Sequence, residues 1–483
     1  MTAYDFHTQF AFALQDSIGQ GQAIQWLAGE AEQWPERWQA IQALTDPVER
    51  LTILAQAMLG THSDRARSGT RQQSGGYRFW VERHASHFLR ERREWMQALG
   101  LEPNLPDLAF FPAASWALEI PFTLRKPYLS KDDTTFHLLD NPVRKEKIFQ
   151  TPMVAATGWK GALRAAMARQ LVEWWSSLSD DEQQQRAARK AFVKRRVQLA
   201  RLFGNEKGVQ TDDTSVEAFL DTCSGEAQAR HYRRVIRRFC SSSGFFAGRL
   251  HFFATFFDKL GLEVINPHNR QSGVGERGPI LIECVPQGTT GTLLLLYVPS
   301  GSLDRREVAH DLAVTAQGLH AMLTTCGFGA KTSSGFGVVE EQLAGQGRLL
   351  IRAALAAPDA PASPQAAPPA PGPARYLETP TRLHADFRRP DGSLKSAVEY
   401  EAFVKSQGRQ YGKQERQLYE KAQKWWEREG RQLTEAAAQE PVAQPAPEAP
   451  PRPSVTERTF TTLSGLQEQA QQVAAQLRSG GGG

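Results

Sequence analysis

Gly327-Phe328-Gly329-Ala330-Lys331-Thr332-Ser333-Ser334-Gly335-Phe336-Gly337 is a glycine-rich loop between a helix-like run and the apolar pair Val338-Val339. Because glycine has no Cβ and tolerates positive φ, the backbone N–H groups and the single lysine of such a loop can approach a phosphate closely. No Gly-Lys-Ser/Thr ends the loop, so it differs from the nucleotide-binding fingerprints. The loop therefore predicts a polyanionic ligand. The alternative is a structural turn whose glycines let it pack against neighbouring backbone.

Further motifs lie upstream of this loop. The first is a set of three segments, Asp140-Asn141-Pro142-Val143-Arg144, Thr151-Pro152-Met153-Val154 and Thr157-Gly158-Trp159-Lys160-Gly161-Ala162-Leu163-Arg164. They are followed by Arg201-Leu202-Phe203-Gly204 and by Glu283-Cys284-Val285-Pro286-Gln287-Gly288-Thr289. In this order, the motifs and the glycine loop resemble the RAMP superfamily (repeat-associated mysterious proteins), the crRNA-binding subunits of type III CRISPR effector complexes. The likeness covers roughly residues 115 to 345.

The resemblance implies an α+β fold with a ferredoxin-like, RRM-like core. Hydrophobic patterning agrees with it, since strand-like and helix-like runs alternate in the order strand, helix, strand, strand, helix, strand. These runs lie around residues 116–124, 161–175, 248–257, 291–297 and 305–322, with the glycine loop leading into the last strand. One departure concerns Ala156-Thr157-Gly158, where many members of the family read Gly-Ser-Ser, so the local turn is expected to differ.

Composition shifts divide the chain into five segments. Irregularly spaced tryptophans and leucines predict helices at the N-terminus. An Ala/Pro tract too poor in large apolar residues to form a core predicts an extended linker, followed by a partly disordered helical C-terminal appendage. No core strand is expected beyond Leu355. The predicted segments are a helical extension at 1–112, the core at 113–355, a linker at 356–375, a helical appendage at 376–440, and a proline-rich linker with a short tail at 441–483.

Charge and cysteine content narrow the class of protein. The net charge is only +5, but residues 186–201 contain basic side chains and no acidic one, and four arginines cluster at 233–238. Such runs are either solvated helix faces or contacts to RNA phosphates. The four cysteines are widely spaced, which argues against a zinc site or a disulfide framework. No signal pattern or membrane-spanning stretch is apparent, so a soluble cytoplasmic protein is expected.

Two segments supply the candidate RNA-binding residues. Lys160 precedes Gly161 near the predicted start of a helix, where the helix dipole already favours a phosphate, and Arg164 lies one turn later. The alternative is that Lys160 and Arg164 are ordinary exposed helix residues. From the glycine loop, the candidates are Gly327, Gly329, Lys331, Ser333, Ser334, Gly335 and Gly337.

The candidate catalytic group is Asp140. The resemblance implies that an aspartate at this motif position lies on a thumb-like loop beside the target RNA and is needed for its cleavage, with Mg²⁺ or another divalent metal as a possible cofactor. A carboxylate there can hold a metal or accept the proton of a 2′-OH, which leaves a 2′,3′-cyclic phosphate. Asp132 and Asp133 are rival carboxylates, and His137 is a weaker candidate base. The alternative for Asp140 is a purely structural turn before Pro142.

Two functions follow from the resemblance. In the first, the chain binds a crRNA guide within a type III CRISPR complex and cleaves target RNA, with the other subunits as partners. In the second, it is a non-catalytic capping and assembly subunit that only holds guide and target RNA. Asp140 favours the first, and the N-terminal helical extension favours the second. A third possibility, an endonuclease that matures crRNA, would require a histidine-centred site, for which His137 is the one candidate.

Overall fold

The computed structural model divides the chain into two compact units, one made of Met1–Ala357 with Pro453–Gly483 and one made of Pro358–Arg452. The residues that the structure describes are 44, 46–55, 63–69, 76–132, 137–139, 141–205, 215–239, 245–266, 280–301, 303–353, 376–379, 382–389, 393–430 and 454–479.

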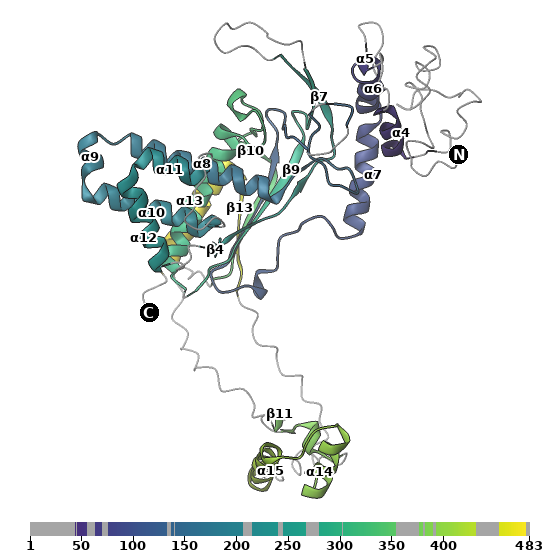
Figure 1. Ribbon diagram of the computed structural model, residues 1–483, viewed down its shortest axis with the longest axis vertical. Coiled ribbons are helices and arrows are strands. Elements are labelled where there is room, and N and C mark those ends of the chain that lie inside the picture. The colour runs from purple at the N-terminus through teal and green to yellow at the C-terminus, as the bar shows by residue number, and fades with distance from the viewer. Residues whose placement is uncertain are drawn as a thin grey trace. The chain divides into compact units, whose positions relative to one another are not determined.

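The first unit is a mixed α+β fold around a five-stranded antiparallel sheet (Figure 1). Its strands in spatial order are β13 (Thr456–Thr462), β10 (Gln342–Ile351), β1 (Trp116–Thr123), β9 (Thr290–Tyr297) and β5 (Leu250–Phe252). The predicted strands around 116–124 and 291–297 are confirmed by β1 and β9. Helix α8 follows β1 and helix α13 follows β9, as the sequence predicts. The predicted strand at 248–257 is divided into β5 and β6 (Thr255–Phe256), and β6 lies in a separate two-stranded sheet.

One face of the sheet is covered by three long helices, α8 (Ala156–Ser176), α13 (Arg305–Ala321) and α17 (Leu463–Ser479). Side chains alternate along a strand, so every second residue of β1 enters the core beneath these helices. These inward residues are Trp116, Leu118, Ile120 and Phe122, all fully buried. On the opposite face, Ala117 packs with Leu108 of the preceding segment and Leu296 of β9. Residues 105–111 thus cover part of the second face.

A helical group extends from the end of α8. It consists of α9 (Asp180–Gln184), α10 (Arg186–Phe203), α11 (Val216–Ser224) and α12 (Glu226–Phe239). The rings of Trp175 on α8 and Phe192 on α10 lie 5.0 Å apart, which fixes the start of α10 beside the end of α8. Helices α10 and α12 pack through a small separate core of Val193, Ala200, Tyr232 and Ile236. Within the described residues, no helix is long and apolar enough to cross a membrane.

The N-terminal part contains helices, as the sequence predicts. They are α4 (Pro47–Leu54), α5 (Ser63–Ala66), α6 (Gly76–Arg83) and α7 (Ala85–Ala98), and the predicted helices before residue 44 lie outside the described residues. Helix α6 contacts β7 (Gly261–Ile265), which forms a hairpin with β8 (Ile280–Cys284). Tyr77 and Trp80 of α6 belong to the same buried cluster as the sheet core. The N-terminal helices are therefore an integral part of the first unit.

The expectation that no core strand lies beyond Leu355 is wrong. Strand β13 pairs along the edge of β10, and Phe460 of β13 is buried in the main core. Helix α17 then packs against α13 through six buried side chains, Leu463, Leu466, Ala470, Val473, Ala474 and Leu477. The C-terminal residues thus complete the sheet and its helical layer, because the apolar stripe of α17 needs a partner surface.

The second unit has a small core of its own. It contains β11 (Leu377–Thr379), β12 (Arg382–Leu383), α14 (Ala397–Ser406) and α15 (Lys413–Trp425). Tyr400 of α14 lies at the centre of this core, with its ring 4.6 Å from that of Phe387 and 5.3 Å from that of Tyr419. Stacked aromatic rings give a short segment a large buried area.

Replacement of Leu466 by alanine tests the C-terminal contribution to the core. The side chain is fully buried, so Leu466→Ala should lower the free energy of unfolding by about 2–5 kcal/mol. The control is Val398→Ala in the second unit, where the side chain is 78% exposed and the change should stay within about 0.5 kcal/mol. Chemical denaturation measures both. Equal stability of Leu466→Ala and the unsubstituted chain would mean that α17 is not part of the cooperative fold.

Candidate nucleic-acid interface

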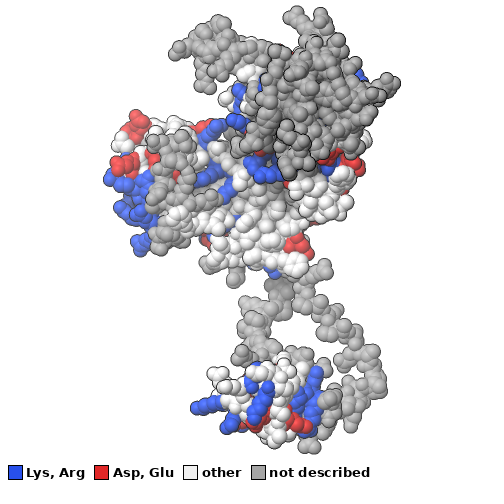
Figure 2. Space-filling model, turned by 45° about the vertical axis from the view of Figure 1, so that its right-hand side comes forward, with Lys and Arg blue, Asp and Glu red and all other residues white. Residues whose placement is uncertain are grey.

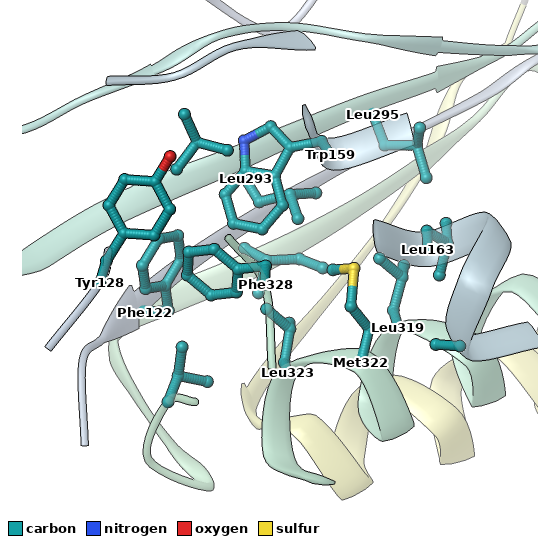
Figure 3. Close-up of a cluster of buried hydrophobic side chains, with 14 of the residues drawn as sticks. Phe122, Tyr128, Trp159, Leu163, Leu293, Leu295, Leu319, Met322, Leu323 and Phe328 are labelled. Carbon is teal, nitrogen blue, oxygen red and sulfur yellow. The ribbon is translucent and has the colours of Figure 1, made fainter. Parts of the chain in front are cut away.

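A buried aromatic contact joins the two predicted RNA-binding segments (Figure 3). Phe328 of the glycine loop is fully buried, and its ring centroid lies 4.4 Å from that of Trp159 in the first turns of α8. Phe122 of β1 and Tyr128 complete the contact, at 5.9 and 5.4 Å from the Phe328 ring. The loop and the start of α8, far apart in sequence, are thus held side by side on the sheet core.

Three of the loop glycines are required by close packing of the backbone. A Cβ at Gly337 would collide with the carbonyl oxygen of Phe328, and one at Gly327 would lie 2.5 Å from that of Phe336. A Cβ at Gly329 would collide with the Leu129 carbonyl. All three have positive φ, which a side chain would strain further. These three glycines therefore have a structural role in packing the loop, whether or not they also contact a ligand.

The outer part of the loop is exposed. Lys331, Ser333 and Ser334 face solvent, and a Cβ at Gly335 would meet nothing within 4 Å. Lys331 has a left-handed backbone, with φ of 56°, and directly precedes the short 3-10 helix Thr332–Ser334. Left-handed backbone is uncommon for a residue with a Cβ and is often found at functional sites. The loop thus presents one cation and two hydroxyl groups outside its packed glycines.

The N-terminus of α8 also has the properties of an anion site. The helix begins after Ala155, which provides no side-chain cap, and its first turn contains no acidic residue. No acidic side chain of the first turn therefore neutralises the positive end of the helix dipole. Lys160 is half-buried and Gly161 is exposed. Partial burial and the nearby Lys160 ammonium lower the pKa of His251, which places this lysine close to strand β5.

Arg164 is engaged within the protein. Its guanidinium lies 2.7 Å from the carboxylate of Glu217 on α11, and Arg196 contacts the same carboxylate at 2.8 Å. The predicted contact between Arg164 and RNA would thus compete with an existing ion pair. It remains a prediction, as do the RNA contacts of Lys160 and Lys331.

A fully buried carboxylate, Glu283 of β8, contacts residues that flank Asp140 in the sequence. The Lys145 ammonium lies 2.6 Å from one of its oxygens, and His137 Nε2 lies 3.2 Å from the other. The Val143 N–H donates a hydrogen bond to it at 2.8 Å, and the Tyr77 hydroxyl from helix α6 donates another. This set of contacts, which we call the Glu283 clamp, thus ties His137, Val143 and Lys145 to helix α6.

The electrostatics of Glu283 follow from these partners. Burial alone raises the pKa of a carboxyl group, but the Lys145 ammonium and the His137 ring outweigh it and hold the pKa of Glu283 well below its ordinary value. Burial raises the pKa of the Tyr77 phenol, and the neighbouring carboxylate raises it further. The carboxylate is therefore ionised at neutral pH, and Tyr77 remains a hydrogen-bond donor.

The structure describes one of the three candidate catalytic aspartates. Asp132 accepts a hydrogen bond from the Lys145 N–H at 3.4 Å, and its own N–H donates to the Pro142 carbonyl, so it lies beside the motif segment. Asp133 and Asp140 lie outside the described residues. Among the residues that are described, no group of three or more His, Cys, Asp and Glu side chains is placed to hold a metal.

Sequence reasoning missed the clamp around Glu283. It singled out Glu283 as part of a motif and His137 as a candidate base, but the structure places the His137 ring against Glu283. Tyr77 is 206 residues away in sequence, so no local pattern indicates the contact. The one available signal was an acidic residue inside the apolar strand of β8, which must be paired when buried.

The model of the RAMP superfamily matches residues 75–340. No curated protein matches the chain.

Three solved structures are similar to the chain. A chain of the type III-B Cmr-beta complex bound to cognate target RNA is 14% identical, with 67% of this chain and 86% of that chain covered and a TM-score of 0.30. A chain of a CRISPR RNA-guided surveillance complex, pre-nicking, is 13% identical, with coverages of 52% and 80% and a TM-score of 0.25. Cmr6 from Pyrococcus furiosus is 17% identical, with coverages of 47% and 99% and a TM-score of 0.24.

Replacement of Glu283 by glutamine tests the clamp. It leaves the Lys145 ammonium buried without its counter-charge, so the free energy of unfolding at pH 7 should fall by about 3–5 kcal/mol. The depressed pKa means that this stabilisation is present above the unfolded-state pKa of about 4.3 and is lost as pH falls further towards the folded-state value. The deficit of the variant should therefore be constant from pH 7 to about pH 5 and shrink below about pH 4.

Denaturation curves across this pH range give the comparison. The control is Glu82→Gln on α6, whose partner Arg78 lies 2.9 Å away on the surface, and the expected loss is below about 1 kcal/mol. A Glu283→Gln loss as small as that of the control would contradict the clamp.

Proposed function

The chain belongs to the RAMP superfamily, and from this premise we propose that it is a guide-RNA-binding subunit of a type III CRISPR effector complex, built on a ferredoxin-like core. The observation that carries the proposal is the contact between Trp159 and Phe328, which brings the start of α8 beside the glycine loop. Each of these segments is suited to a phosphate for an independent reason. Held together, the two segments form a continuous binding surface for an RNA backbone.

The proposed contacts divide by chemistry. Lys331 supplies a charge from an exposed position, and Ser333 and Ser334 supply hydroxyl donors. Lys160 adds charge to the uncapped end of α8. Contacts of this kind are made to phosphates and sugars, which fix the position of an RNA without reading its sequence. A guide-binding subunit needs this property, because it must accept many different guides.

Lys331→Ala in the full chain tests RNA binding. Loss of one phosphate contact should weaken every guide sequence alike and reduce the slope of log affinity against log salt by about 0.7 to 1. Lys413→Ala, which removes an exposed charge from α15 in the second unit, is the matched control and should leave the slope unchanged. Filter binding with several guides across a salt series gives the measurement. Losses that depend on guide sequence, or an unchanged slope for Lys331→Ala, would contradict the proposal.

We further propose that the bound guide positions a target RNA for cleavage at Asp140. The 2′-OH of a flipped nucleotide would attack the adjacent phosphorus, its proton would pass to the carboxylate, and the bond to the 5′ oxygen would break as that oxygen takes up a proton. The products are a 2′,3′-cyclic phosphate and a 5′-OH. In the alternative form of this proposal, Asp140 would instead hold a divalent cation such as Mg²⁺, which would supply charge stabilisation at this site.

The clamp at Glu283 gives this proposal a physical basis. His137, Val143 and Lys145, which flank Asp140 in the sequence, all contact the same buried carboxylate. The alternative, a capping subunit that holds RNA without cutting it, is favoured by the N-terminal helices, which are built into the core through Tyr77 and Trp80.

Asp140→Asn distinguishes the two functions. It removes the charge that proton transfer or metal binding needs but keeps most hydrogen-bonding capacity, so target cleavage should fall by about a hundredfold or more. Guide affinity should not change. Asp132→Asn and Asp133→Asn are the matched controls, and product ends are identified on a denaturing gel with and without Mg²⁺. Intact cleavage by Asp140→Asn within the assembled complex would exclude the catalytic role and leave the capping function.

A further inference from the structure

Two sets stand out among the basic side chains of α10 and α12, and the sequence alone cannot separate them. The first set is neutralised inside the protein by acidic side chains of neighbouring helices. These ion pairs are Arg196 with Glu217 and Asp221, Arg201 with Glu307 and Asp311, and Arg233 with Asp221. They orient the helices against one another, so their charge is not available to a ligand.

The second set remains exposed. Its members have no acidic partner within the described part of the chain, and they are Arg186, Lys190 and Lys194 of α10 and Arg234 and Arg237 of α12. We call these five residues the outer basic face. Figure 2 shows Lys and Arg side chains gathered at the left-hand edge of the larger unit, where this helical group lies. Five cations without an acidic side chain in contact, on two packed helices, create a positive potential, although Asp180, Asp181 and Glu182 of α9 lie shortly before Arg186 in the sequence.

The spacing of these residues follows the helix geometry. Arg186, Lys190 and Lys194 are four residues apart, so they form one row about 12 Å long on α10. Helix α12 is fixed beside α10 by the core of Val193 and Tyr232, which makes the face rigid. A rigid row of cations suits a ligand whose negative charges also recur at regular intervals.

The outer basic face is separate from the proposed guide-binding site. Trp175, at the end of α8, contacts Phe192 in the middle of the α10 row, and Lys160 lies 15 residues earlier on α8. This corresponds to about 22 Å along the helix axis. The two regions are therefore too far apart to share a single phosphate. A helical RNA strand of about seven or more nucleotides is long enough to span them.

We propose that the outer basic face is a second phosphate-binding surface, which contacts the backbone of an RNA already held at the glycine loop. This inference rests on the proposed function for the identity of the polyanion. RNA is favoured over an acidic protein by the character of the surface. The described side chains of α10 and α12 include no exposed large apolar residue, whereas protein interfaces have an apolar core and are depleted in lysine.

The test compares two triple variants of the full chain. Arg186→Ala, Lys190→Ala and Lys194→Ala together should weaken binding of a guide-length RNA by about ten- to a hundredfold at 0.15 M salt and reduce the salt slope by about 2. The control is Lys413→Ala, Lys421→Ala and Lys424→Ala, which removes the same charge from exposed positions of α15. Circular dichroism and thermal unfolding confirm that both variants are folded.

Combination with Lys331→Ala separates this inference from the proposed function. Since the two sites are well apart, their losses in binding free energy should add. A loss from Lys331→Ala with none from the outer-face variant would overturn the second surface and leave the proposed function intact. Equal losses from the outer-face and control variants would also overturn it. So would an outer-face variant that binds RNA normally but fails to assemble with other subunits, since that result identifies an acidic protein as the ligand.

Discussion

The position of Phe122 on β1 is the constraint on which the rest of the first unit depends. Its ring makes edge-to-face contacts with Phe328 of the glycine loop at 5.9 Å, with Trp159 of α8 at 5.9 Å and with Phe257 at 6.3 Å, measured between ring centroids. Gly291 on the neighbouring strand leaves the space, since a Cβ there would lie 2.7 Å from the Phe122 ring. Each such aromatic contact contributes about 0.5–1.5 kcal/mol beyond area burial. The start of α8 and the loop are therefore positioned by packing, with no need for a ligand.

Two buried carboxylates then fix the elements around this core. Glu283 contacts His137, Val143 and Lys145. Asp311 of α13 accepts hydrogen bonds from Gln198 at 2.8 Å, Arg201 at 2.7 Å and the Tyr297 hydroxyl at 2.9 Å. A buried carboxylate is costly unless all its partners are in place, so each network selects one arrangement of its elements. The network at Asp311 also pairs Arg201, one of the basic residues at 186–201, within the protein.

The sequence predicted those features whose signal is local. The central strands and the helices α8 and α13 follow from apolar periodicity, and the glycine loop follows from composition. Strand β13 was missed because its single buried residue, Phe460, lies among Thr, Glu and Arg, as is common for an edge strand, and because two proline-rich tracts precede it. Which basic residues of α10 and α12 are paired and which are exposed depends on acidic residues distant in sequence. The contact of Tyr77 with Glu283 is also between distant residues, and no spacing rule indicates either feature.

The return of the chain to the sheet also explains how a second unit is accommodated. Ile351, at the end of β10, lies directly opposite Thr456, at the start of β13. The chain therefore leaves and re-enters the sheet on adjacent strands, about 5 Å apart. Because the ends of the intervening segment are already together, its length has little effect on the core, as loop-closure entropy grows only slowly with length. Residues 352–455 thus form an insertion at an edge of the sheet, whereas the strand and helix that follow belong to the core.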